Sequence, residues 1–303
     1  MADPARVLGV ASQRPAWDSA PRSPTLERFY RELMAVDELP SSPEVAQKML
    51  VTINRETAST RELAALIGRD QALAARLLRL ANSSFFATRA RVDSIQQAVT
   101  LLGFARVRDI VLGLSVWGAL DRKSTSGRRY RKLLWRHAAT VAGAAKKLGD
   151  LAGLDGGQAF TAGLLHDVGK LVLGLRLGES YWAMLDEAAE RQMPTAAIEL
   201  EALGCQHATV GGWLLQLWRL PPALVDPVAQ HHEPLAAEFG LDLPNVLGLA
   251  DRLVHATDPE TGAAHPEALA EIHAFAPGFV AADSWTALYG ALRNDPALAL
   301  FDA

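Results

Sequence analysis

Several ionisable side chains of this sequence lie on predicted apolar helix faces, where an unpaired charge would be strongly unfavourable. His137 and Asp251 each have a leucine three or four residues before them and a valine three or four residues after them. His207 likewise shares its predicted helix face with apolar residues. Such positions require a compensating partner. The seven candidate metal ligands, which come from five predicted helices, are His137, His166, Asp167, His207, His231, His232 and Asp251.

Imidazole and carboxylate groups together are the ligands that zinc, manganese and iron sites use. Seven such groups exceed the needs of one tetrahedral zinc ion, so two divalent transition metal ions with shared ligands would fit the set. A single histidine on an apolar face is more simply explained as a core residue bonded to a carbonyl. The presence of all seven in one part of the chain favours a metal site instead.

These side chains can act together only if several helices bring them to one place. Capping residues and prolines predict that set of helices after residue 129. The predicted ranges are 130–149, 157–168, 179–191, 195–203, 206–219, 223–232 and 244–257, with one or two more helices between 266 and 300. Lys170 would then lie just past the end of a helix and close to Asp167.

A second group of helices is predicted earlier in the chain. Ser42, which precedes a proline, predicts a helix start, and Ser59 and Ser94 each have Glu or Gln three residues later, as in a capping box. A leucine stripe ends at Asn82, a residue that tolerates left-handed geometry, and a long apolar stretch covers 95–114. No stretch shows the alternation of a strand. The sequence therefore predicts an all-α fold with two packed helical lobes.

The domain organisation follows from this pattern. Residues 1–24 are predicted to be a flexible tail, 25–121 the first helical lobe, 122–129 a basic polar join, and 130–303 the second helical lobe with the metal pocket. The apolar stretch at 95–114 is longer than the first lobe needs for its own core. We therefore expect the two lobes to pack against each other.

The composition limits the class of protein. The chain has 303 residues, of which 50% are hydrophobic and 21% charged, as in a globular protein. It has no apolar run of about 18 residues and no secretory segment, so we expect a cytoplasmic protein that does not enter a membrane. The single cysteine, Cys205, cannot form an internal disulfide, and we expect a core thiol.

The charge distribution gives little reason to expect a nucleic-acid partner. The net charge of −4 provides no general attraction to a polyanion. One basic cluster surrounds the predicted join and is more simply explained as a solvated linker than as a phosphate site. Its members are Arg122, Lys123, Arg128, Arg129, Arg131 and Lys132.

The order of the candidate ligands carries a family resemblance. His137, then the pair His166 and Asp167, then Asp251 resemble the His, His-Asp, Asp signature of the HD phosphohydrolase superfamily. The resemblance implies that these four residues hold a metal ion.

Further ligands resemble those of one branch of that superfamily. His207 and the triplet His231, His232 and Glu233 are similar to the extra ligands of the HD-GYP branch, which hydrolyses cyclic dinucleotides with two or three metal ions. The Gly-Tyr-Pro motif of that branch is absent after Pro234. Its substrate specificity therefore does not carry over.

The first lobe resembles the HD-related output domain (HDOD) family. The segments LPSSP at 39–43, LLRLANS at 77–83 and LLG at 101–103 are similar to the HDOD pattern, although Gln71 replaces the family's common proline. The resemblance covers roughly residues 26–257. It implies an output or scaffolding module of bacterial signalling with signalling proteins as partners. Many members lack some metal ligands, whereas this sequence keeps them.

Two principal functions stay open at this point. The first is a signalling module whose metal site is structural or senses a ligand. The second is a metal-dependent phosphohydrolase acting on a nucleotide or a cyclic dinucleotide, with Asp167 and Lys170 as catalytic residues. The simpler alternative for Lys170 is a surface lysine beside a helix terminus. RNA or nucleotide binding through the basic cluster is a third alternative.

Overall fold

The computed structural model describes residues 18, 24–33, 59–86, 91–123, 126–233, 242–257, 264–267, 269–270 and 282–300. These residues form helices and contain no β-strand, apart from one isolated antiparallel bridge between Thr257 and Ala264. The predicted all-α fold is confirmed. Across the same described residues, no helix has both the length and the apolar character needed to cross a bilayer.

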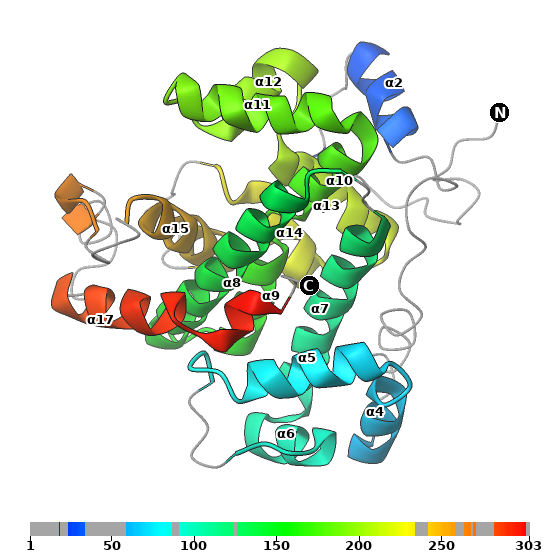
Figure 1. Ribbon diagram of the computed structural model, residues 1–303, viewed down its shortest axis with the longest axis vertical. Helices are drawn as coiled ribbons and strands as arrows, with labels where there is room; N and C mark the ends of the chain where they lie inside the picture. The colour runs from blue at the N-terminus through cyan, green and yellow to red at the C-terminus, as the bar shows by residue number, and fades with distance from the viewer. Residues whose placement is uncertain are drawn as a thin grey trace.

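The helices have the following bounds in chain order: α2 (Pro24–Leu33), α4 (Thr60–Ile67), α5 (Gln71–Ala81), α6 (Ile95–Leu102), α7 (Phe104–Lys123), α8 (Arg128–Leu151), α9 (Gly156–Leu165), α10 (Val168–Leu177), α11 (Glu179–Glu190), α12 (Thr195–Leu203), α13 (His207–Leu217), α14 (Pro222–Gln230), α15 (Leu243–His255), α17 (Ala282–Arg293) and the 3₁₀ helix η3 (Pro296–Ala299). Figure 1 shows α4, α5 and α6 together at one end of the molecule and α11 and α12 at the opposite end. The long helices α7 and α8 lie between these two ends.

Local capping sets the helix starts of the first lobe. Ser59 and Glu62 form the predicted capping box at the start of α4. Ser94 caps α6 by accepting a hydrogen bond from the Gln97 backbone N–H, but the Gln97 side chain accepts from Asp93 instead of completing the box. The helix predicted after Ser42 and nearly all of the predicted tail lie outside the described residues.

Two details of the first lobe differ from the sequence predictions. Gly103 has a φ of 92° and divides the apolar stretch at 95–114 into α6 and α7. Asn82 ends α5 with a φ of −90° and so does not adopt left-handed geometry. Its side-chain amide instead donates to the Leu78 and Val92 carbonyls at 2.8 and 2.7 Å. These bonds hold the chain after α5 against the helix end.

One hydrophobic core runs through both lobes. Helix α7 packs against α5 and α6 on one side and against α9 and α10 on the other. Trp117 of α7 meets Trp135 of α8 edge to face, with ring centroids 5.2 Å apart. The two helical lobes are therefore packed against each other, as predicted.

The connection between the lobes is short and well anchored. Helix α7 ends at Lys123 and α8 begins at Arg128, so helices take up half of the segment predicted as a polar join. Arg131 of the basic cluster pairs with Asp121 at 2.8 Å and also donates to the Ser126 carbonyl. Both lobes are thus tied together by charged and polar contacts at this point.

The second lobe contains a helix that the sequence did not predict. The helix predicted over 157–168 ends at Leu165, the chain turns at His166 and Asp167, and α10 begins at Val168. After this turn, α10 lies so close to α13 that a Cβ on Gly169 would collide with the His207 carbonyl oxygen. Lys170 lies in the first turn of α10 and is buried. The alternative of a surface lysine is therefore wrong, and Lys170 lies inside a helix and not past the end of one.

Candidate metal centre

Four predicted ligands from three parts of the second lobe meet in one cluster. His137 comes from α8, His166 and Asp167 from the turn between α9 and α10, and Asp251 from α15. Nε2 of His137 lies 2.9 Å from Oδ1 of Asp251 and 3.3 Å from Nε2 of His166. Nε2 of His166 lies 3.4 Å from Oδ2 of Asp167 and 3.6 Å from Oδ1 of Asp251. We call these four residues the HD cluster.

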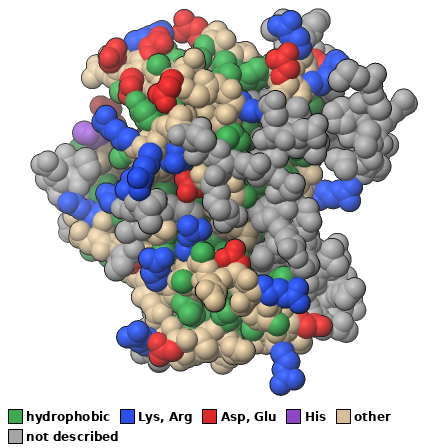
Figure 2. Space-filling view, turned by 45° about the vertical axis from the view of Figure 1, so that its right-hand side comes forward, with side chains coloured by type: hydrophobic (Ala, Val, Ile, Leu, Met, Phe, Trp, Pro, Cys, Tyr) green, Lys and Arg blue, Asp and Glu red, His purple; other side chains and the backbone are tan. Residues whose placement is uncertain are grey.

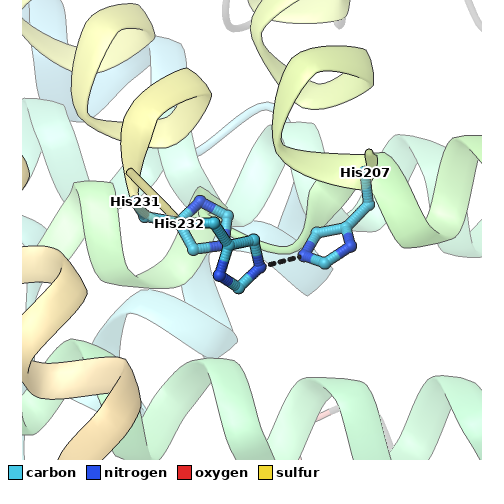
Figure 3. Close-up of side chains that lie close together, drawn as sticks. All are labelled: His207, His231 and His232. Atoms are coloured by element: carbon cyan, nitrogen blue, oxygen red, sulfur yellow. Dashed lines mark hydrogen bonds between the residues drawn. The ribbon is translucent and has the colours of Figure 1, made fainter. Parts of the chain in front are cut away.

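The three other histidines form a second cluster beside the first. His207 begins α13, and His231 and His232 directly follow α14. Figure 3 shows their rings converging from these two helix ends, with Nε2 of His232 2.9 Å from Nε2 of His207. The nearest ring nitrogens of the three lie within 4.8 Å of one another. We call these residues the triple-histidine cluster.

Asp167 links the two clusters through its two carboxylate oxygens. Oδ2 lies 3.4 Å from Nε2 of His166 in the HD cluster. Oδ1 lies 3.1 Å from Nε2 of His207 and 4.0 Å from Nε2 of His231 in the triple-histidine cluster. A carboxylate in this orientation can contribute one oxygen to each of two neighbouring metal ions.

Three histidine rings are held in orientation by contacts of Nδ1, the ring nitrogen that faces away from the centre. Nδ1 of His166 donates to the Gly163 carbonyl and Nδ1 of His231 donates to the Val228 carbonyl, each at 2.7 Å. Nδ1 of His207 lies 2.6 Å from a carboxylate oxygen of Glu199. With Nδ1 protonated, the free electron pair of each ring lies on Nε2 and faces the centre. Metal-binding histidines are usually held by such outer hydrogen bonds.

The unpaired atoms of the centre fit a metal ion. Oδ1 of Asp167 and Nε2 of His231 are buried and make no hydrogen bond within the described residues. Buried polar atoms are rarely left without a partner. Bonds of about 2.0–2.1 Å at tetrahedral angles place two ligand nitrogens about 3.3 Å apart. The His137 and His166 nitrogens have a separation of 3.3 Å. The residues present therefore suit a divalent transition metal.

A buried ammonium group completes the centre. Nζ of Lys170 donates to Oδ2 of Asp167 at 2.8 Å, and both side chains are at most 8% exposed. Burial alone would lower the pKa of Lys170, but the carboxylates of Asp167, Asp251 and Glu199 together outweigh it and raise that pKa. Lys170 is therefore a permanent positive charge beside the central carboxylate.

The charged groups of the centre strongly affect one another's pKa values. Burial favours the neutral forms of His166 and Asp167, but the charge on each residue stabilises the charge on the other. The pKa of His166 is therefore raised to about 10, and the pKa of Asp167 is held well below its ordinary value. Burial lowers the pKa of His137 to about 4 and that of His232 to about 3. The carboxylates thus attract positive charge, while His137 and His232 stay neutral, as metal ligands must be.

Two features of the centre were missed in the sequence. His255 lies four residues after Asp251 on α15, and its Nδ1 is 3.0 Å from Oδ1 of Asp251. The spacing of four on one helix face was the available signal. Glu199 is fully buried behind His207. The sequence pointed to Glu199 only indirectly. The helix predicted to start near Gln206 has no Ser, Thr, Asp or Asn there to cap it, so a side chain from elsewhere had to serve as the cap.

The HDOD domain family profile matches residues 39–234, which is more than half of the chain. The chain belongs to the HDOD family. This agrees with the resemblance seen in the sequence. The HD cluster extends past the matched range, because Asp251 lies on α15.

One curated protein is similar to the chain in sequence. The HDOD chain is 28% identical over 231 residues to an uncharacterised protein of Treponema pallidum. The aligned part is 75% of this chain but only 44% of that relative. The chain thus spans less than half the length of the curated relative that it matches.

Solved structures share the fold. A Shewanella amazonensis protein, provisionally named a phosphohydrolase, has a TM-score of 0.68 at 24% identity, covering 92% of this chain and 97% of its own. An HDOD domain protein of unknown function from Geobacter sulfurreducens has a TM-score of 0.66 at 23% identity, covering 89% and 96%. A Marinobacter aquaeolei protein, provisionally named a signal transduction protein, has a TM-score of 0.58 at 23% identity, covering 91% and 63%.

Proposed function

We propose that this chain is a regulatory module of signal transduction whose second lobe holds a centre of two divalent transition metal ions. Iron, manganese and zinc suit the mixed imidazole and carboxylate ligands. The HD cluster would hold one ion and the triple-histidine cluster the other, with Asp167 shared between them. Other signalling proteins would be the partners of the module.

The orientation of Asp167 is the observation that carries metal binding. Its carboxylate directs one oxygen to each cluster, and Oδ1 is buried without a hydrogen bond among the described residues. Without a cation, Oδ1 has only the 3.1 Å contact with Nε2 of His207, and Nε2 of His231 stays buried without a hydrogen bond among the described residues. Two cations would satisfy these atoms at once.

The signalling role is supported by family membership and by fold. HDOD proteins are associated with output functions, and the Marinobacter aquaeolei protein of similar fold is named for signal transduction. The sequence lacks the Gly-Tyr-Pro motif after Pro234 that accompanies cyclic dinucleotide hydrolysis. A site that binds metal and a ligand, and whose occupancy changes the binding of a partner protein, agrees with the signalling association and with the missing motif.

Phosphoester hydrolysis is the second candidate, and Lys170 is the observation that favours it. A divalent ion bound here would supply Lewis acidity toward a phosphate ester and lower the pKa of water. Lys170 would place its ammonium beside Asp167, where negative charge on a phosphoryl group needs compensation. A nucleotide or cyclic dinucleotide is the substrate class that this arrangement suits.

Metal analysis of the purified protein tests the proposed function. The full chain is expressed with iron and manganese available and purified anaerobically, and its metal content is measured by elemental analysis. We expect between one and two ions per chain. Asp251→Ala removes a ligand of the HD cluster and should lower this number, whereas Asp226→Ala on α14 should not. Well under one ion per wild-type chain would favour a plain histidine core and contradict the proposal.

A further inference from the structure

Glu199 of α12 is a buried carboxylate in a part of the molecule where acidic side chains otherwise face solvent. Figure 2 shows acidic side chains gathered at the end of the molecule formed by α11 and α12. Glu201, two residues further along α12, is 64% exposed, whereas the Glu199 side chain has no exposure. A carboxylate is costly to bury unless hydrogen bonds compensate it. The position of Glu199 therefore points to a specific role.

Three donors surround the Glu199 carboxylate. The Tyr181 hydroxyl of α11 donates to Oε1 at 2.5 Å. The backbone N–H of His207 donates to Oε2 at 2.7 Å, and Nδ1 of the same residue lies 2.6 Å from Oε2. Gln206 offers no side-chain cap at the start of α13, so Glu199 caps this helix from a neighbouring one. Both the backbone and the ring of His207 are thus held by one carboxylate.

This contact distinguishes His207 from the other anchored histidines. His166 and His231 donate from Nδ1 to neutral backbone carbonyls, whereas the acceptor of His207 is a charged carboxylate. A carboxylate acceptor fixes the Nδ1–H tautomer and makes Nε2 a stronger electron-pair donor. Nε2 of His207 lies 3.1 Å from Oδ1 of Asp167, on the side of the centre. The effect of Glu199 is therefore directed into the triple-histidine cluster.

We propose that Glu199 is a positioning residue that sets the orientation and donor strength of His207, and that Tyr181 holds Glu199 in place. The inference rests on the proposed metal binding, and it adds two residues that do not themselves touch the metal. Two buried hydrogen bonds and one buried ion-pair contact then connect α11 through α12 and α13 to the centre. A change in the packing of α11 would move Tyr181 and Glu199 and so alter the orientation of His207 at the metal site.

Zinc titration of the full chain tests the role of Glu199. Binding of zinc to metal-free protein is measured by calorimetry and fitted to two sites. Glu199→Gln keeps the size of the side chain but removes its charge, and it should weaken one of the two sites by about 10- to 100-fold. Tyr181→Phe leaves the carboxylate in contact with His207 and should weaken the same site by about two- to tenfold. Glu201→Gln makes the same charge change on the exposed face of α12 and should leave both sites unchanged.

Nuclear magnetic resonance separates positioning from a merely structural role. In zinc-loaded protein, the Nδ1–H proton of His207 should be protected from exchange with water and shifted by its strong hydrogen bond to Glu199. This signal should move and exchange faster in Glu199→Gln, while it should be unchanged in Glu201→Gln. Wild-type zinc affinities together with a wild-type His207 signal in Glu199→Gln would overturn the proposal.

The outcomes also distinguish this inference from the proposed function. If wild-type protein binds no zinc, the proposed metal centre is contradicted. The His207 signal of the metal-free protein then decides whether Glu199 holds the ring. Circular dichroism shows whether each variant folds. If Glu199→Gln does not fold, Tyr181→Phe carries the test, and unchanged zinc affinity with an unchanged His207 signal in that variant would overturn the proposal.

Discussion

Lys170 donates a buried hydrogen bond to Asp167, and the distance from Nζ to Oδ2 is 2.8 Å. The same carboxylate directs its other oxygen toward His207. Asp167 therefore contacts His166 of the HD cluster, the triple-histidine cluster and Lys170. Lys170 is the only lysine of the centre among the described residues. A change at Asp167 should have the largest effect on function.

Asp167→Ala should remove metal from both clusters, because its carboxylate faces both. If the protein is a hydrolase, cleavage of cyclic di-GMP and of an aryl phosphodiester should fall by about two orders of magnitude or more. If it is a binding module only, metal content should fall and neither protein should cleave either substrate. Circular dichroism serves as the fold control. Equal, measurable rates in wild type and variant would exclude hydrolysis at this centre.

His255→Ala should weaken metal binding at the HD cluster. Nδ1 of His255 lies 3.0 Å from Oδ1 of Asp251 and 3.1 Å from the Asp251 backbone carbonyl oxygen, so its removal takes both polar contacts from a proposed ligand. Loss of such an outer partner lowers metal affinity by about tenfold or more. Metal titration of the variant measures the effect. His265→Ala, on the exposed surface, is the matched control. Identical affinities in the two variants would show that His255 does not support Asp251.

Gly169→Ala should destabilise the second lobe strongly. A Cβ at this position would collide with the His207 carbonyl oxygen and would lie 2.8 Å from the Gly211 backbone nitrogen. Both obstacles are backbone atoms, so α10 and α13 must separate, at a cost of about 3 kcal/mol in the free energy of unfolding. Gly290→Ala in α17 is the control, because a Cβ there meets nothing within 4 Å. Thermal unfolding should show a lower Tm for the first variant only, and equal Tm values would contradict the packing described.

The isolated first lobe, expressed as residues 25–121, should not fold into a compact domain. Trp117 and Leu114 of α7 are buried, and Trp117 packs on Trp135 of the second lobe. Separation would expose this apolar face to water. We expect broad urea unfolding and binding of a hydrophobic dye. A sharp, cooperative transition of a monomer that binds no dye would show that the first lobe is an independent domain.

The sequence alone predicted the helical class, most helices of the second lobe and the identity of the seven candidate ligands. These features depend on local patterns. Helical phase places His137 and Asp251 on buried faces, and Ser59 with Glu62 fixes a helix start within four residues. The predicted set also came together in space, although its role in metal binding stays a proposal.

Tertiary packing decided what local patterns could not. The apolar residues around His166 and Asp167 continue a helical pattern, yet the chain turns between α9 and α10, and Gly169 then packs against the backbone of α13. The same turn gives Asp167 its orientation toward both clusters and buries Lys170. Glu199 accepts a hydrogen bond from the first backbone N–H of α13, a helix that has no capping side chain at its own start. Contacts between helices distant in sequence carry no local period, so only the folded chain could place these groups.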